Sequence, residues 1–207
     1  MSMPSGVFIT CSNSVCNVII LIMEQERVCP WWLGYTLILP IRKLQHDPQK
    51  ILAPHVNPGM KIMDYGCAMG YFSIPLARMT GSGGKVYCVD IQEKMLAKLR
   101  KRAAKYAVAD IIVPLQVGKD YHAADLQGKL DFALLFAVVH EVPDKAALFA
   151  DMFVMLKPGG KILFVEPQNH VTTEEFRKSI AMARDAGFNE LDEKPLKKGL
   201  AVLLVRY

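Results

Sequence analysis

The sequence predicts an α/β domain built on a doubly wound, mostly parallel sheet of seven strands, with an antiparallel last strand and helices on both faces. Two observations predict this fold class. From Lys61 onward, short apolar segments alternate with segments of helical length, an order typical of parallel sheets with helical crossovers. The apolar segments also lack polar alternation, as expected of strands that are buried on both sides. The 207 residues correspond to about one domain.

A lead-in is expected before this alternation begins. Residues 1–22 are predicted to be an extension of uncertain order, with Met23 as a candidate natural start, and residues 23–58 a helical lead-in or lid. Within it, Asp47 and Pro48 form a favourable helix start, because aspartate caps a free N–H and proline suits the first helical position. A short helix is therefore expected over Gln49–Ala53, and residues 59–207 should form the α/β domain.

The first half of the domain should contain three strands. The apolar run Lys61–Tyr65 ends in a glycine-rich loop, and the following helix, Tyr71–Met79, is closed by the turn "TGSGG". Strand Lys85–Asp90 comes next, then helix Glu93–Ala107, and then strand Ile111–Val117. The second of these helices carries apolar side chains on one face, at Leu96, Leu99, Ala103 and Tyr106.

The second half begins with the nearly continuous apolar strand Leu130–Ala137. Helix Pro143–Leu156 starts with proline and ends at the turn "KPGG", before strand Lys161–Glu166. Helix Thr172–Ala186 is opened by a capping box, in which Thr172 and Glu175 exchange hydrogen bonds.

Two strands, Glu190–Glu193 and Leu200–Arg206, should close the sheet. Only the segment Lys194–Gly199 separates them. Because a parallel crossover needs a dozen or more residues, these two strands are expected to pair antiparallel.

Composition narrows the class of protein. Hydrophobic residues make up 52% of the chain, which excludes a disordered protein, and the formal net charge of +5 permits an anionic ligand without requiring one. Cysteines occur without a repeating spacing, at Cys11, Cys16, Cys29, Cys67 and Cys88. Such scattered thiols indicate a reducing, cytoplasmic location, and the first three lack the spacing and fourth ligand of a metal site, so no metal is expected. The apolar segment Val15–Met23 is too short to span a membrane, and no basic residue precedes Arg27, as a signal peptide would require.

The loop after the first strand, "MDYGCAMGY", is the strongest indication of a ligand, since ligands bind at the carboxyl ends of strands in such folds. A G-x-G-x-x-G dinucleotide frame counted from Gly66 puts Ala68 second and Tyr71 third, where tyrosine fits poorly. An acid-x-Gly-x-small-x-Gly frame is instead filled by Asp64, Gly66, Ala68 and Gly70.

A second acid, Asp90, ends the next strand, where a carboxylate can accept hydrogen bonds from both hydroxyls of a ribose. A nicotinamide cofactor would use the same contact, and Asp90 can alternatively cap the following helix. Two later segments complete the pattern: "FAVVHEVPD", Phe136–Asp144, and "LKPGGKILFVEP", Leu156–Pro167.

In this order, "DYGCAMGYFSIPLA", "KVYCVDIQEKML", "DFALLFAVVHEVPD" and "LKPGGKILFVEP" resemble the Rossmann-like class I S-adenosylmethionine-dependent methyltransferases. The sequence is most similar to their small-molecule branch, which includes the ubiquinone- and menaquinone-biosynthesis methyltransferases. The resemblance covers about Asp47 to Tyr207 and makes residues 59–207 the methyltransferase domain. It implies S-adenosyl-L-methionine as cofactor, S-adenosyl-L-homocysteine as product, and in-line transfer of a methyl group.

The resemblance also implies roles for single residues. Asp64, Gly66, Ala68 and Gly70 would surround the methionine part of the cofactor. Asp90 would bind the ribose hydroxyls, Ile91 would lie against the adenine, and the backbone around Phe136 would face the methionine end. The family often has an acid directly after a glycine at the third strand, whereas here Lys119 follows Gly118 and leaves Asp120 as the candidate adenine contact.

His140 and Glu141 follow the fourth strand and are the candidate catalytic residues. An imidazole titrates near neutral pH, so His140 suits a general base, which is needed only if the acceptor must lose a proton. Alternatively, His140 helps to cap the helix that starts at Pro143. Glu166, at the end of the fifth strand, is either a substrate ligand or a cap for the next loop.

The acceptor is expected to be a small molecule, and the chain a monomer or homodimer. Trp31, Trp32 and Tyr35 form an aromatic cluster that either covers an apolar acceptor or packs the lead-in on the sheet. A methyltransferase acting on RNA or protein would need a basic cleft at the carboxyl edge, and a non-catalytic protein would bind the cofactor without turnover. Nucleic acid is not expected, because the basic side chains recur opposite an apolar helix face, at Lys94, Lys98, Arg100, Lys101, Arg102 and Lys105.

Overall fold

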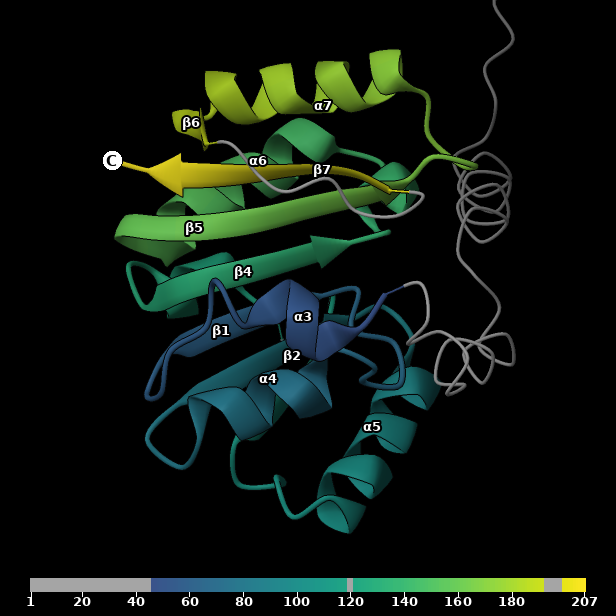
Figure 1. The fold of residues 1–207 in the computed structure, drawn as a ribbon, viewed down its shortest axis with the longest axis vertical. Coiled ribbons are helices and arrows are strands. Elements are labelled where there is room, and N and C mark those ends of the chain that lie inside the picture. The colour runs from purple at the N-terminus through teal and green to yellow at the C-terminus, as the bar shows by residue number, and fades with distance from the viewer. Residues whose placement is uncertain (1–45, 119–120, 192–198) are drawn as a thin grey trace, which may run out of the picture.

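The computed structural model describes residues 46–118, 121–191 and 199–207, which form a seven-stranded sheet flanked by helices (Figure 1). The strands are β1 (Lys61–Tyr65), β2 (Lys85–Asp90), β3 (Ile112–Gln116), β4 (Leu130–Phe136), β5 (Leu156–Pro167), β6 (Phe188–Leu191) and β7 (Gly199–Arg206). The helices are α3 (Pro48–Leu52), α4 (Ser73–Thr80), α5 (Glu93–Lys105), α6 (Lys145–Met155) and α7 (Thr173–Asp185), with 3-10 turns η3 (Ala123–Leu126) and η4 (Val139–Glu141).

The strand order is β3-β2-β1-β4-β5-β7-β6, which confirms the predicted doubly wound sheet. Strands β1 to β5 pair parallel, whereas β7 runs antiparallel to both β5 and β6, as its opposed arrow in Figure 1 shows. Strand β1 lies between β2 and β4, so the strand order runs one way from β1 to β3 and the other way from β4 onward. The loops that follow β1 and β4 therefore flank the point where such sheets bind ligands.

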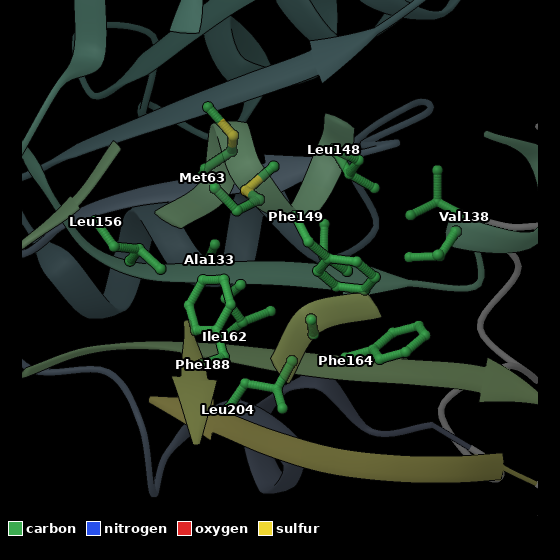
Figure 2. Close-up of a cluster of buried hydrophobic side chains, with 14 of the residues drawn as sticks. Met63, Ala133, Val138, Leu148, Phe149, Leu156, Ile162, Phe164, Phe188 and Leu204 are labelled. Carbon is green, nitrogen blue, oxygen red and sulfur yellow. The ribbon is translucent and has the colours of Figure 1, made fainter. Parts of the chain in front are cut away.

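Two apolar cores hold the helices on the two faces of the sheet. One contains side chains from α6 and α7, and Figure 2 shows part of it, with Met63 of β1, Phe149 of α6 and Phe164 of β5. The other contains side chains from α3, α4 and α5. Residues Met63 and Ile62, neighbours on β1, belong to different cores, because successive side chains of a strand point to opposite faces. Burial on both faces explains why the strands read as continuous apolar runs.

The predicted helix starts are set by local hydrogen bonds. The Asp47 carboxylate accepts the backbone N–H of Gln49 at 3.0 Å, with Pro48 in the first turn, as expected. The capping box of α7 is also confirmed, since Thr172 and Glu175 each accept the other's backbone N–H. These caps satisfy N–H groups that have no partner within the helix.

Other element ends differ from the prediction. Helix α4 begins at Ser73 rather than at Tyr71, and α6 begins at Lys145 because the Asp144 carboxylate, rather than Pro143, caps it. Strand β6 begins two residues earlier than expected, at Phe188, whose ring is buried in the core. Tyr106, predicted on the buried face of its helix, follows the last residue of α5 and is 37% exposed.

The segment "KPGG" was expected to be a turn before the fifth strand, and this is wrong. Strand β5 already begins at Leu156, which pairs with Leu130 of β4 before the register shifts. Gly159 within this segment has a φ of +80°, so the irregular start of the strand is made at a residue without a side chain. The alternation of helix and strand is unaffected.

Candidate functional site

A cavity of about 190 Å³ lies at the carboxyl edge of the sheet. Its walls come from the ends of β1 and β2, the first turn of α5 and the loops after β1, β2, β3 and β4: Tyr65, Gly66, Ala68, Val89, Asp90, Ile91, Gln92, Met95, Val117, Ala137, Val138, Glu141, Val142 and Pro143. The structure thus brings five sequence-predicted residues to one cavity, namely Gly66, Ala68, Asp90, Ile91 and Glu141. This is the switch point of the sheet, where the fold predicts a ligand.

Asp90 is the main polar group of the cavity. Its side chain is buried, and the carboxylate accepts the backbone N–H of Ala68 at 2.9 Å and that of Gln92 at 2.8 Å. Because a carboxylate has about four acceptor sites, these bonds leave capacity for the hydroxyl groups of a ligand. Burial raises the pKa of Asp90, and the N–H groups of Gln92, Ala68 and Ile91 oppose that rise.

The two predicted glycines of the first loop allow close packing. Gly66 has a φ of +75°, and a Cβ there would overlap the side chain of Val138. Gly70 has a φ of +78°, and a Cβ there would overlap Cδ1 of Leu99 on α5. Gly66 therefore lets the loop after β1 pack directly against Val138 in the loop after β4. Gly70 lets Leu99 of α5 pack directly against the first loop.

Ala68 occupies the left-handed region, with a φ of +46°. Ala137, which lines the cavity from the β4 loop, does the same, with a φ of +56°. Non-glycine residues in this region are strained, and such strain concentrates at functional sites. The alanine that replaces a glycine in the sequence frame thus keeps the backbone shape that a glycine would adopt more easily.

Asp64 and Phe136 are not among the residues of the cavity wall. The buried carboxylate of Asp64 accepts a hydrogen bond from Ser73 Oγ at 2.5 Å, which ties β1 to the start of α4. The ring of Phe136 lies 4.5 Å from that of Phe72 and 5.1 Å from that of His46, measured between centroids. These contacts connect the ends of β1 and β4 to residues that precede and begin α4.

A carboxylate and an imidazole meet beside the cavity, where β4 and β5 end. Glu166 is buried, with 1% exposure, and both of its oxygens contact His140. Oε1 accepts the backbone N–H of His140 at 3.0 Å, and Oε2 lies 2.6 Å from its Nδ1. The hydrogen bond to Glu166 raises the pKa of His140, while burial opposes the rise. Glu141 Oε1 lies 4.0 Å from Nε2 of the same ring.

Sequence reasoning placed His140 and Glu166 separately at this edge but missed their pairing. The sequence assigned each residue to the end of a strand, but the pairing of these two strands is seen only in the structure. It also placed Arg102 among the basic side chains opposite the apolar face of its helix, whereas Arg102 donates a hydrogen bond to the carbonyl of Met69 within the first loop. The predicted residues Asp120, Trp31, Trp32 and Tyr35 lie outside the described residues.

The comparisons with known proteins assign the chain to a family. Residues 56–195 match the family described as a methyltransferase domain. The chain belongs to this methyltransferase family. The match includes every described residue of the cavity wall.

Curated relatives of this methyltransferase domain include methyltransferases with different names. A demethylmenaquinone methyltransferase of Bacillus mycoides is 30% identical over 111 residues, which are 54% of this chain and 46% of that protein. A ubiquinone biosynthesis O-methyltransferase of Acinetobacter baylyi is 26% identical over 136 residues, 65% of this chain and 56% of that protein. The chain therefore spans about half the length of these relatives.

A solved structure supports the fold of the methyltransferase domain. A SAM-dependent methyltransferase from Aquifex aeolicus aligns with a TM-score of 0.75 at 21% identity, over 86% of this chain and 100% of that one. In the part of the chain that the structure describes, no helix combines the length and apolar character needed to cross a membrane. Within the same residues, no three His, Cys, Asp or Glu side chains are grouped to hold a metal ion.

Proposed function

We propose that this protein is an S-adenosylmethionine-dependent methyltransferase that acts on a small-molecule acceptor. The observation that carries the proposal is the Asp90 carboxylate, buried at the cavity wall with acceptor capacity left for the ribose hydroxyls of the cofactor. When bound, S-adenosylmethionine supplies an electrophilic methyl group on a sulfonium sulfur, and a neutral thioether leaves.

The cavity wall fits the parts of this cofactor. Ile91 is 55% exposed at the cavity and offers an apolar surface to the adenine, and Val117 lines the same region. The glycine-rich loop, through Gly66 and Ala68, presents backbone rather than large side chains to the methionine part. Asp64, Gly70 and Phe136 would support this loop from behind. Asp120 remains the proposed partner of the adenine amino group.

The chain's contribution to catalysis is mainly alignment of the two reactants. In-line displacement requires the acceptor atom to approach the methyl group from the side opposite sulfur, and correct orientation of bound reactants supplies a large part of the acceleration. The β4 loop, which contributes Glu141 and Pro143 to the cavity, is the proposed acceptor side, with His140 and Glu141 as its catalytic residues. Trp31, Trp32 and Tyr35 are proposed to contact the acceptor.

A small-molecule acceptor is supported by the relatives, whose names refer to demethylmenaquinone and to ubiquinone biosynthesis. On α5, Met95, Leu96 and Leu99 are buried, whereas Lys94, Arg100, Lys101 and Lys105 are exposed, and Arg102 donates to the carbonyl of Met69 in the first loop. A cytoplasmic location fits the free, buried thiols of Cys67 and Cys88.

Calorimetric titration tests the cofactor. S-adenosylmethionine, S-adenosylhomocysteine and NAD are titrated into the wild type, Asp90→Ala, and the matched control Asp110→Ala, whose exposed side chain lies outside the cavity wall. The first two ligands should bind the wild type and the control, and Asp90→Ala should bind them much more weakly. Tight NAD binding without binding of the other two would overturn the proposal.

A further inference from the structure

The arrangement of Glu166 and His140 exceeds what a structural cap requires. A cap for η4 needs one acceptor for the backbone N–H of His140, and Oε1 of Glu166 provides it at 3.0 Å. The second oxygen is nevertheless committed to the imidazole, at 2.6 Å from Nδ1. Both oxygens of a 1% exposed carboxylate are thus used to fix one histidine, in backbone and ring together.

This contact determines which nitrogen of the ring carries the proton. A carboxylate accepts hydrogen bonds but does not donate them, so Nδ1 must carry the proton that it shares with Oε2. In the neutral imidazole, Nε2 then has a free lone pair. The His140 side chain keeps 22% exposure, and Nε2 lies 4.0 Å from Oε1 of Glu141, a residue of the cavity wall. The basic nitrogen is therefore next to the proposed acceptor position.

We propose that His140 is the general base of the methyl transfer, that Glu166 is a positioning residue which fixes its tautomer, and that the acceptor is a phenol-type hydroxyl. This inference rests on the proposed function. In the balanced step, the acceptor's O–H proton passes to Nε2 and the oxygen forms a bond to the methyl carbon. The electron pair of the broken carbon–sulfur bond stays on sulfur, and the imidazolium later releases its proton to solvent.

The acceptor class follows from acidity. A phenol has a pKa of about 10, whereas water-like hydroxyls are near about 15.7, so an imidazole can assist a phenol far better than an aliphatic alcohol. Acceptors that attack through an existing lone pair, such as arsenite, have no need of a base held in one tautomer. An imidazolium formed in the step is stabilised by Glu166 and Glu141, while Lys145 opposes it, and His170 lies edge-on at 5.6 Å between ring centroids.

The tautomer can be read without turnover, by long-range proton–nitrogen NMR on full-length chain with 15N-labelled histidine. His140→Asn assigns the signal. We expect the Nδ1–H form in the neutral wild-type ring. In Glu166→Gln, the amide oxygen remains the acceptor for the backbone N–H of His140. The amide NH2 group then donates to Nδ1, and the ring proton moves to Nε2. Glu141→Gln, which faces Nε2 only, should leave the tautomer unchanged.

Turnover is then measured as S-adenosylhomocysteine released with catechol, hydroquinone, aniline or arsenite as the probe acceptor. The phenols should be methylated, and His140→Asn and Glu166→Gln should lower kcat by about 10²-fold or more, the usual contribution of a general base. Both variants should bind S-adenosylhomocysteine within a few-fold of wild type. The acidic limb of the wild-type kcat–pH profile should disappear in His140→Asn.

Four results would overturn the inference. Two concern the tautomer: an Nε2–H tautomer in the wild type, or an unchanged tautomer in Glu166→Gln. Two concern the acceptor class: turnover of aniline or arsenite with none of the phenols, or absence of turnover with every probe. Wild type that fails to bind S-adenosylhomocysteine would instead overturn the proposed function, so the two failures are distinguishable.

Discussion

The carboxylate of Asp90 accepts a hydrogen bond from the backbone N–H of Ala68, with 2.9 Å between the two heavy atoms. The bond connects the end of β2 to the loop after β1, and both residues line the cavity. Ala68 has a strained φ of +46°, and this bond is one of the contacts that hold it there. The residue proposed to bind the ribose therefore also shapes the loop proposed to hold the methionine part.

Asp90→Asn should weaken cofactor binding more than it weakens the fold. Asp90 uses one oxygen for Ala68 and the other for Gln92, whereas an asparagine has a single acceptor oxygen, so fewer acceptor sites remain for a ribose hydroxyl. Hydrogen bonds to a charged group contribute about 1.5–3 kcal/mol, so we expect S-adenosylhomocysteine to bind about 10- to 100-fold more weakly by calorimetry. Asp110→Asn makes the same chemical change on the exposed surface and should bind normally. Equal affinities for the two variants would exclude a ribose contact at Asp90.

The His140–Glu166 pair should make stability depend on pH. The pKa of His140 is raised in the folded chain, chiefly by Glu166, so the pair stabilises the fold most when the ring is protonated. That contribution is complete below the unfolded pKa of about 6.5 and is lost as pH rises through the folded pKa.

Urea unfolding across this pH range measures the effect. The free energy of unfolding of wild type, minus that of His140→Asn, should fall with increasing pH. A difference that is flat or that grows would contradict the raised pKa. Glu166→Gln should remove most of the same pH dependence, because it removes the charge that raises the pKa.

Ser73→Ala should destabilise the domain through Asp64. The Ser73 hydroxyl donates to the buried Asp64 carboxylate at 2.5 Å, and its loss leaves a buried charged group with one partner fewer. Such a loss costs about 1–3 kcal/mol, which chemical denaturation would detect. Ser179→Ala is the matched control, because Ser179 is also buried and its hydroxyl donates to a helix carbonyl rather than to a charge. A larger loss for the control would exclude this role of Asp64.

Apolar periodicity was sufficient to predict the order of elements, because strands buried on both faces and one-sided helices have different patterns. The antiparallel β7 followed from the short connection alone. Element ends were less predictable, since they depend on tertiary contacts. Strand β6 starts at Phe188 because that ring packs into the core, and β5 starts at Leu156 because it pairs with Leu130.

The site was predictable where one loop or strand end carries the chemistry, as at Gly66 and Asp90. It was not predictable where two distant segments meet. His140 and Glu166 are 26 residues apart, and their contact depends on the register between β4 and β5. A sequence pattern assigns each residue to an edge but not to a partner. The same limit applied to Gly70, whose partner lies on α5.

Gly70→Ala should destabilise the domain strongly, although glycine and alanine are both small. The backbone at Gly70 has a φ of +78°, which costs an alanine about 1–2 kcal/mol, and the added Cβ would overlap Cδ1 of Leu99. Overpacking adds about 1–3 kcal/mol. We therefore expect urea unfolding to show a total loss of about 2–5 kcal/mol.

Gly128→Ala separates the two causes, because Gly128 has a φ of +60° but no atom within 4 Å of the added Cβ. It should lose only the conformational part, about 1–2 kcal/mol. In the double variant Gly70→Ala with Leu99→Ala, the overlap is removed, so the loss should be smaller than the sum of the two single losses. Additive losses, or equal losses at Gly70 and Gly128, would show that the close approach of α5 does not require glycine in this loop.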